Sequence, residues 1–552
     1  MSRKATSDVW WKNAVFYCLD IETFLDSDGD GCGDFPGLCE RIDYLTGLGI
    51  DCVWLMPFMP SCQRDDGYDI TDFYGVDSRL GTHGDLIEVV RTAREGGTRV
   101  IADLVVNHTS NEHPWFKEAR RGRDSRFHDF YVWRDEKPEE KPGDIVFPDQ
   151  ENSNWAFDEQ AGRWYMHSFY SHQPDLNVAN PEVRDEIAQT VGFWLEQGLS
   201  GFRVDAVPFL IEPPRTGQRT RQDPHELLRD LRRYIGRRSG DAVLLGEVNL
   251  APPQQREFFG DEDGDELQVI LSFTVNQAMF LALAREDATP VARALEALPQ
   301  IPEDCQWANF VRNHDELTLD KLSEEERQEV FAAFGPEKEL QLYGRGLRRR
   351  LPTMVGGDER RVRLMYSLAF SLPGAPVLFY GEEIGMAENL AIEGRYSVRA
   401  PMQWSAEPHA GFTTAEGEPC RPLVEDGPFG FSEVNVTSQR RDPHSLLNWM
   451  ERLIRRRREC PELGWGTWSL LNTGDSAVFA QRSDWEDSTI VAVHNFAGRD
   501  ARAHLVIEGE GALVDLFQHD EHELDGGEVE LDLPPYGAAW FRVRRPGRRL
   551  PP

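Results

Sequence analysis

The chain has 552 residues, of which 40% are hydrophobic and 11% aromatic, enough for a large core and for more than one domain. Its formal net charge of −35 disfavours nucleic acids and anionic membranes as partners, because both repel an acidic surface. The start, MSRKATSDVWWKN, lacks the apolar core of a signal peptide, and no stretch approaches the length of a membrane span.

The eight cysteines are scattered, with no C-x-x-C pair and no dense framework. This pattern is typical of reduced thiols in the cytosol. We therefore expect a cytoplasmic protein, and a homo-oligomer is compatible with the sequence.

Eight short apolar runs alternate with helix-like segments along most of the chain. The helix before the fourth run is the clearest, because Asn180 suits the N-cap, Pro181 suits the first helical position and an apolar stripe follows. Helices are also expected over 37–48 and 83–95. The alternation predicts a (β/α)₈ barrel, a fold of the α/β class. The runs are 14–20, 51–57, 98–106, 201–205, 242–247, 267–273, 307–313 and 375–381.

Additional segments interrupt and extend this barrel. From about residue 463 the pattern changes to short alternating runs such as SAVFAQRS and TIVAVHNFA, which predict an antiparallel β-sandwich. We expect a catalytic barrel over 1–108 and 181–460 with added segments at about 317–363 and 386–437, an inserted domain over 109–180, and the sandwich over 461–552.

Three of the runs end on a carboxylate: GFRVD at Asp205, LLGE at Glu247 and FVRNHD at Asp315. The carboxyl ends of parallel barrel strands meet at one rim, so these acids are expected to form one site. Arg203 shares its strand face with Asp205 and would keep that carboxyl ionised.

Glycosidic bond cleavage needs this chemistry. One carboxylate attacks the anomeric carbon, and a carboxylic acid about 5–5.5 Å away protonates the leaving oxygen when configuration is retained. We assign Asp205 as nucleophile, Glu247 as acid/base and Asp315 as stabiliser.

Five ordered motifs support this assignment. DLVVNH, QPDLN, GFRVDAVP, GEVN and FVRNHDE resemble the signature regions of the α-amylase superfamily, glycoside hydrolase family 13. The resemblance spans roughly Trp10 to the C-terminus. It implies that 109–180 is the small domain B beside the cleft, and that the sugar in the −1 pocket is bound by Asp66, Tyr68, His108 and His314.

A loop after the first run, DSDGDGCGD, places acids at alternate positions around glycines, which suits Ca²⁺. The twelfth position is Gly37 and no helix enters the loop, so it is not an EF-hand. Many oligosaccharide-acting members of the superfamily hold calcium in a similar loop, with a main-chain carbonyl as one ligand. The first calcium site is therefore expected at Asp26, Asp28, Asp30, Cys32 and Asp34.

The resemblance also suggests a second calcium, which a lysine replaces in some relatives. No nucleotide-binding or redox motif is evident, so no organic cofactor is expected. The ligands of this second site would be Asn107, Asp175, Phe209, Leu210 and Glu212.

Within the superfamily, the stretches QPDLN, RNHDELTLD and GRYSVRAPMQW are most similar to trehalose synthases, which isomerise maltose to trehalose. On that likeness Asn249, Glu316 and Arg399 would line the +1 pocket and hold the released glucose. The substrate would be a disaccharide or a short α-glucan. The stretch EVNLAPP departs from the EANQWP usual in trehalose synthases, which bears on product specificity.

The sequence leaves two alternatives open. The same carboxylates would serve an α-glucosidase or short-chain amylase that releases glucose to water. A non-catalytic interaction subunit would be expected to lack one of the three acids, and none is lacking.

Overall fold

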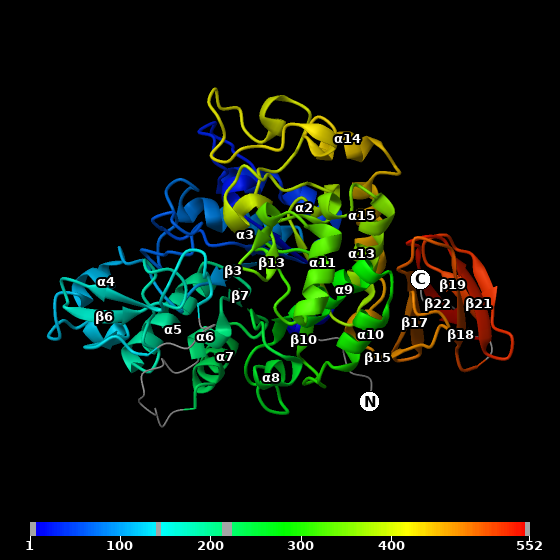
Figure 1. Ribbon diagram of the computed structural model, residues 1–552, viewed down its shortest axis with the longest axis horizontal. Coiled ribbons are helices and arrows are strands. Elements are labelled where there is room, and N and C mark those ends of the chain that lie inside the picture. Colours follow the sequence, from blue (N-terminus) through cyan, green and yellow to red (C-terminus); the bar gives the residue numbers. More distant parts are fainter. Residues whose placement is uncertain (1–6, 140–144, 212–222, 510, 547–552) are drawn as a thin grey trace.

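The computed structural model describes residues 7–139, 145–211, 223–509 and 511–546. Figure 1 shows a central barrel, with the inserted segment that contains α4 and β6 on one side and the C-terminal strands on the other. No helix among the described residues is long and apolar enough to cross a membrane.

Eight parallel strands close into a barrel, which confirms the predicted fold class. The first strand pairs with both the second and the last, so the sheet has no free edge. Nearly all residues of these strands are buried, as expected for strands covered on both faces. In chain order the strands are β1 (Phe16–Leu19), β2 (Cys52–Leu55), β3 (Arg99–Leu104), β7 (Gly201–Val204), β8 (Val243–Gly246), β9 (Val269–Leu271), β10 (Gln306–Phe310) and β14 (Ala375–Phe379).

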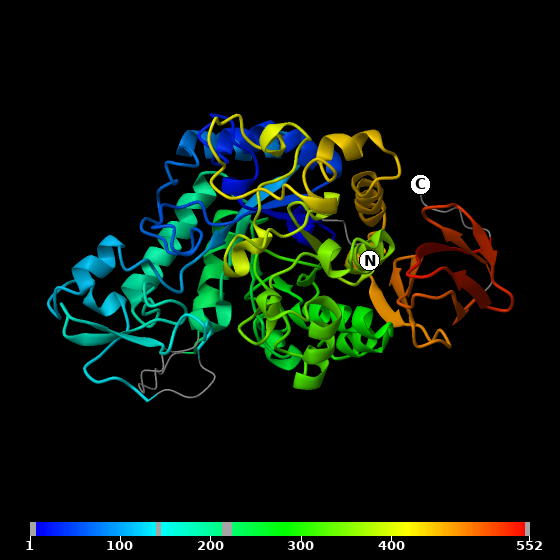
Figure 2. The same cartoon turned by 45° about the horizontal axis from the view of Figure 1, so that its top comes forward.

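Helices pack around this barrel (Figure 2). The Asn180 side chain accepts a hydrogen bond from the N–H of Glu182, which starts α5 (Pro181–Glu196) as the sequence predicts. Its buried stripe includes Val191 and Trp194. The helix expected over 37–48 is instead two helices, because the backbone of Arg41 departs from helical geometry and separates them. Apart from α4 of the inserted segment, the other α-helices up to β14 are α1 (Phe35–Glu40), α2 (Ile42–Leu48), α3 (His83–Glu95), α6 (Val207–Ile211), α7 (Glu226–Arg238), α8 (Pro252–Glu257), α9 (Phe273–Arg285), α10 (Thr289–Glu296), α11 (Glu324–Phe334), α12 (Leu351–Met354) and α13 (Glu359–Ser371).

The segment between β3 and β7 contains a short helix and a three-stranded antiparallel sheet. The segment between β10 and β14 contains a second three-stranded sheet, which the helix-like composition did not predict. The elements are α4 (Pro114–Ala119), β4 (Trp133–Arg134), β5 (Trp155–Asp158) and β6 (Arg163–Met166) in the first, and β11 (Leu317–Thr318), β12 (Gln341–Leu342) and β13 (Gly346–Leu347) in the second.

Three helices lead from the barrel to two antiparallel sheets, as the alternating pattern predicts. The inner faces of these sheets share a core that includes Val491, Leu505 and Phe541. The elements are α14 (Val436–Arg441), α15 (Leu446–Arg458), α16 (Glu462–Trp465), β15 (Thr467–Leu470), β16 (Val478–Trp485), β17 (Ser488–Asn495), β18 (Ala501–Val506), β19 (Ala512–Asp515), β20 (Glu521–Glu523), β21 (Glu528–Leu533) and β22 (Ala538–Arg544).

Candidate active site

One buried guanidinium joins carboxylates from three neighbouring strands of the barrel. Arg203 on β7 donates from Nη1 to Asp205 Oδ1 at 2.6 Å and to Asp103 Oδ1 at 2.5 Å. Its Nη2 donates to Glu247 Oε2 at 2.6 Å. Because both nitrogens belong to one planar group, the carboxyls of Asp205 and Glu247 are held side by side, compatible with the spacing of about 5–5.5 Å in retaining enzymes.

The backbone after the strand end strengthens this arrangement. Ala206 has φ of 46°, a conformation that costs energy for any residue with a Cβ. The turn directs the Ala206 N–H to Glu247 Oε2 at 3.2 Å. The same carboxyl oxygen of Glu247 therefore accepts from the Ala206 amide and from Arg203.

Both carboxyls line the pocket, and the surrounding protein changes their acidity. It raises the pKa of Asp205 to about 6, because desolvation and the charges of Asp103 and Asp315 outweigh Arg203. Burial also raises the pKa of Glu247, against the opposing effect of Arg203. A raised pKa suits Glu247 as a proton donor near neutral pH.

These shifts predict the pH dependence of catalysis. We expect kcat/KM to fall on the acid side with an apparent pKa of about 6, because Asp205 must be ionised to attack. On the alkaline side it should fall as Glu247 loses its proton. The two groups interact, so the profile reports apparent values of the pair. Initial rates across pH measure this, and an acid limb near the free-carboxyl value of about 4 would contradict it.

Asp315 has the opposite environment. Its carboxylate contacts Nη1 of Arg395 at 2.8 Å, Nη2 of Arg399 at 3.0 Å and Nε2 of His314 at 3.1 Å. Burial alone would raise its pKa, but His314 and the two arginines hold the pKa well below the usual range. The carboxyl of Asp315 is therefore ionised at working pH, as a stabiliser of positive charge requires.

The acid that faces the pocket in the loop after β2 is Asp65, not the expected Asp66. Asp65 lines the pocket and accepts from Arg395, from the Tyr396 hydroxyl at 2.7 Å and from Gln173 Nε2 at 2.8 Å. Asp66 has φ of 52°, so the chain turns there and the two acids separate.

Arginines hold Asp66 away from the pocket. Its two carboxylate oxygens pair with Arg399 and Arg421, and its pKa falls to about 2 because these charges outweigh burial. Arg399, expected on the +1 wall, is completely buried behind Asp66 and Asp315. Of these two arginines, it is Arg395, four residues before Arg399, that lies on the pocket wall.

Three rings surround the carboxyls. The Tyr68 hydroxyl lies 2.9 Å from Nε2 of His314, and the two rings stack. Nε2 of His108 lies 3.1 Å from the Tyr68 carbonyl, and burial lowers the pKa of His108 to about 4. His108 is thus neutral at working pH. Tyr68 and His108 line the pocket, whereas His314 lies behind Tyr68 and Asp315.

The side chains enclose a pocket of about 560 Å³, within the usual range for small-molecule sites. The three carboxyls share its wall with Asn249, whose Nδ2 donates to Asp320 at 3.1 Å, and with Glu316, which lies 3.7 Å from Arg345. Asp320 was not predicted. The lining residues are Asp65, Tyr68, His108, Ile145, Val146, Phe147, Phe169, Asp205, Ala206, Pro208, Phe209, Glu247, Asn249, Leu250, Phe273, Asn313, Asp315, Glu316, Thr318, Asp320, Lys321, Arg345 and Arg395.

An aromatic cover, formed by the rings of Phe147, Phe169 and Tyr343, runs from the pocket wall in the inserted segment to the β12–β13 turn. The ring centroids of Phe147 and Tyr343 lie 5.1 Å apart. Phe147 also contacts Phe169, and the Phe169 ring packs on Phe209. Tyr343 has φ of 55°, which is unusual for a bulky residue. The contact therefore joins two segments that are separate in the chain, and its Phe147 ring lines the pocket.

The loop expected to hold the first calcium brings three carboxylates together. Oxygens of Asp26, Asp28 and Asp34 lie within 4.8 Å of one another. The Asp30 N–H lowers the pKa of Asp28, but desolvation and the surrounding carboxylates outweigh it and raise this pKa. Such crowding of like charges fits a hard divalent cation. Asp30 instead accepts the N–H of Cys32 at 2.7 Å.

The residues expected around a second calcium are only partly brought together. Asn107 Nδ2 donates to Asp175 Oδ1 at 3.2 Å, and Ser168 also donates to Asp175. Phe209 and Leu210 lie on α6. Glu212 lies outside the described residues, so this ligand set stays a prediction.

Comparison with known proteins places this geometry in context. Residues 21–333 and 347–466 match the model of the alpha amylase catalytic domain, and 488–542 match a sucrose hydrolase-like C-terminal domain. The chain is 38% identical to a trehalose synthase from Pimelobacter sp. (strain R48), over 97% of this chain and 96% of that one. It is 39% identical to a trehalose synthase/amylase of Mycobacterium tuberculosis, over 97% and 90%. A crystal structure of a trehalulose synthase mutant matches with a TM-score of 0.79, 26% identity and coverage of 97% and 100%.

Proposed function

The chain belongs to the α-amylase family, and we propose that it is a trehalose synthase that isomerises maltose to trehalose by glucosyl transfer. The observation that carries the proposal is the pair of carboxyls held on the Arg203 guanidinium, with an ionised third acid in the same pocket. The similarity to trehalose synthases along nearly the whole chain supports the choice of substrate.

The reaction proceeds by double displacement. Asp205 attacks the anomeric carbon of maltose while Glu247 gives its proton to the leaving oxygen. The released glucose stays in the +1 region near Asn249 and Glu316 and turns. Its anomeric hydroxyl then attacks the anomeric carbon of the glucosyl unit while Glu247 takes the proton of that hydroxyl, so the ester bond to Asp205 breaks and trehalose forms. A water molecule in place of this glucose gives hydrolysis, so the ratio of products depends on how well the cover excludes water.

Incubation with maltose alone tests the assignment. We expect trehalose to accumulate faster than glucose, resolved by anion-exchange chromatography at early times. Glucose as the sole product would contradict the proposal and identify the enzyme as an α-glucosidase or amylase.

Opening the aromatic cover should change the ratio of products. We expect Tyr343→Ala to raise the glucose-to-trehalose ratio by about three- to tenfold, which corresponds to about 0.7–1.4 kcal/mol of lost discrimination. The matched control is Phe157→Ala, which removes an exposed ring of the inserted segment that packs on Trp164, whereas Tyr343 packs on the pocket residue Phe147. An unchanged ratio in Tyr343→Ala would show that this ring does not exclude water.

We propose that calcium binds at Asp26, Asp28 and Asp34, with the Cys32 carbonyl as a further ligand. Removing it with a chelator should lower the melting temperature by about 2–5 °C, because a ligand that binds only the folded state stabilises it. Asp28→Asn should abolish this difference, and Asp500→Asn, an exposed acid in the sandwich, should retain it. Differential scanning fluorimetry measures the change in melting temperature. A wild-type melting temperature that is the same with chelator and with calcium would contradict the site.

We propose that the protein is located in the cytoplasm, because its scattered cysteines are typical of reduced thiols in the cytosol. All eight cysteines are free in the structure.

A further inference from the structure

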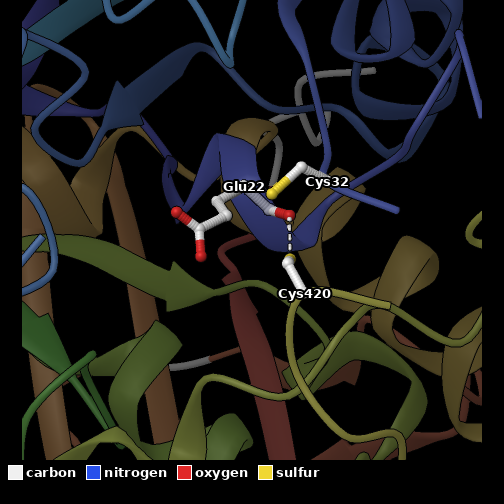
Figure 3. Close-up of side chains that lie close together, drawn as sticks. All are labelled: Glu22, Cys32 and Cys420. Carbon is white, nitrogen blue, oxygen red and sulfur yellow. Dashed lines mark hydrogen bonds between the residues drawn. The ribbon is translucent and has the colours of Figure 1, made fainter. Parts of the chain in front are cut away.

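Two cysteines that are distant in the sequence lie together beside the calcium-like loop. The sulfurs of Cys32 and Cys420 lie within 4.8 Å of each other. Figure 3 shows both beside the main chain of Glu22, whose carbonyl accepts from Cys420 Sγ at 3.5 Å. Cys32 is partly buried and Cys420 is exposed, so an oxidant in solution can reach the pair at Cys420.

The main chains of the two segments that carry these cysteines are hydrogen-bonded to each other. The Cys420 N–H donates to the Gly31 carbonyl at 2.8 Å, and the Asp26 N–H donates to the Phe412 carbonyl at 3.0 Å. A disulfide needs its two Cα atoms close together, and a main-chain hydrogen bond next to the pair supplies that proximity.

We propose that Cys32 and Cys420 are a redox-modification site that forms an intramolecular disulfide. With glutathione disulfide as oxidant, one cysteine thiolate attacks its sulfur and releases one glutathione thiolate. The second cysteine thiolate attacks the resulting mixed disulfide and releases the other glutathione. The two protons pass to the departing thiolates, so two cysteine thiols are oxidised and one disulfide is reduced to two thiols.

A metal is the competing occupant, because a carboxylate oxygen of Glu22 also lies within 4.8 Å of both sulfurs. That carboxylate is already paired with Arg79 at 2.9 Å and Arg421 at 3.4 Å. Two arginines beside the third ligand oppose a cation, and they leave the sulfurs free to bond to each other. The geometry thus favours a disulfide over zinc.

The cross-link would fasten the loop over 26–34 to the segment over 413–421. Arg421 follows Cys420 directly and pairs with Asp66, whose other partner is Arg399 beside Asp315. The disulfide therefore fixes a segment that supports the active site. The Cys32 carbonyl, proposed above as a calcium ligand, takes no part in the bond.

Peptide mass spectrometry on the native protein tests the site. The purified enzyme is treated with glutathione disulfide, its remaining thiols are alkylated with iodoacetamide, and it is digested without reduction. We expect a peptide pair that joins Cys32 to Cys420 and disappears on reduction. Equal alkylation of both residues in treated and untreated protein would overturn the proposal, as would glutathione attached stably to Cys420.

Variants and a metal control complete the test. Cys32→Ser and Cys420→Ser should each remove the cross-link, while Cys39→Ser, which removes a partly buried thiol on α1, should retain it. Oxidation should raise the melting temperature of the wild type and of Cys39→Ser by at least about 2 °C. Zn²⁺ added to the reduced enzyme should leave alkylation of both cysteines unchanged. Stoichiometric protection by Zn²⁺ would replace the disulfide by a metal site.

Discussion

Replacing Asp205 with Asn is expected to lower kcat on maltose by about 10⁴-fold or more, the range seen when a catalytic nucleophile is removed. Asn is nearly the same size, so it keeps a hydrogen-bond acceptor for Arg203 and the pocket should stay folded. The loss therefore reports chemistry, because an amide does not form the glucosyl ester. Steady-state rates with maltose measure it, with circular dichroism as the check on folding.

The partner carboxyl supplies the control that separates the two roles. Glu247→Gln should also lose activity on maltose, but it should still react with α-glucosyl fluoride, whose leaving group needs no proton. The covalent glucosyl-enzyme should then accumulate and be found by mass spectrometry on the peptide that contains Asp205. Asp205→Asn should show no adduct with this substrate. An adduct on another residue, or full activity of Asp205→Asn, would contradict the nucleophile assignment.

Replacing Arg203 with Gln should damage both catalysis and stability. The change removes the charge that neutralises Asp103, Asp205 and Glu247 in a buried site, where an unpaired charge costs about 3–5 kcal/mol. The carboxyls should respond by holding protons more tightly, so the pKa of Asp205 should rise above about 6. The acid limb of kcat/KM should therefore move to higher pH.

Denaturant unfolding and the pH profile together check this role. Arg203→Lys should recover part of the stability, because lysine restores the positive charge. It cannot restore the paired hydrogen bonds of the planar guanidinium group. Arg238→Gln, which removes an exposed arginine paired with Glu196, should leave both readouts unchanged. An Arg203→Gln enzyme with an unshifted acid limb would show that this guanidinium does not set the ionisation of Asp205.

The strand pattern was sufficient to predict the barrel. The local signals of each strand are strong, since apolar runs such as Ala375–Phe379 are bounded by turns. The same signals placed Asp205 and Glu247 at one rim, because strand ends in a parallel barrel share a side.

The sequence did not reveal which loop side chains face the pocket. Asp65 and Asp66 are adjacent and chemically alike, and the positive φ of Asp66 decides which one faces the pocket. Arg395 and Arg399 likewise differ only in the direction each takes from its turn. No short motif signals such a choice, because it is fixed by partners such as Asp315 from distant segments.

Contacts between separate segments were also invisible in the sequence. The Phe147–Tyr343 contact and the Cys32–Cys420 pair each join residues from different parts of the chain. The two members of each pair are far apart in the sequence, and no repeat or motif connects them. They follow from the packing of the loops at the barrel rim.

The central claim is that the glucose displaced from maltose by Asp205 is retained and then attacks the glucosyl unit bound to Asp205 through its own anomeric hydroxyl. The most direct test is conversion of unlabelled maltose in the presence of excess isotopically labelled free glucose, with the trehalose analysed by mass spectrometry. The account predicts trehalose that carries no label, because both glucosyl units come from one maltose molecule. Trehalose with one labelled ring would mean that glucose exchanges with solution, and it would contradict a closed intramolecular transfer.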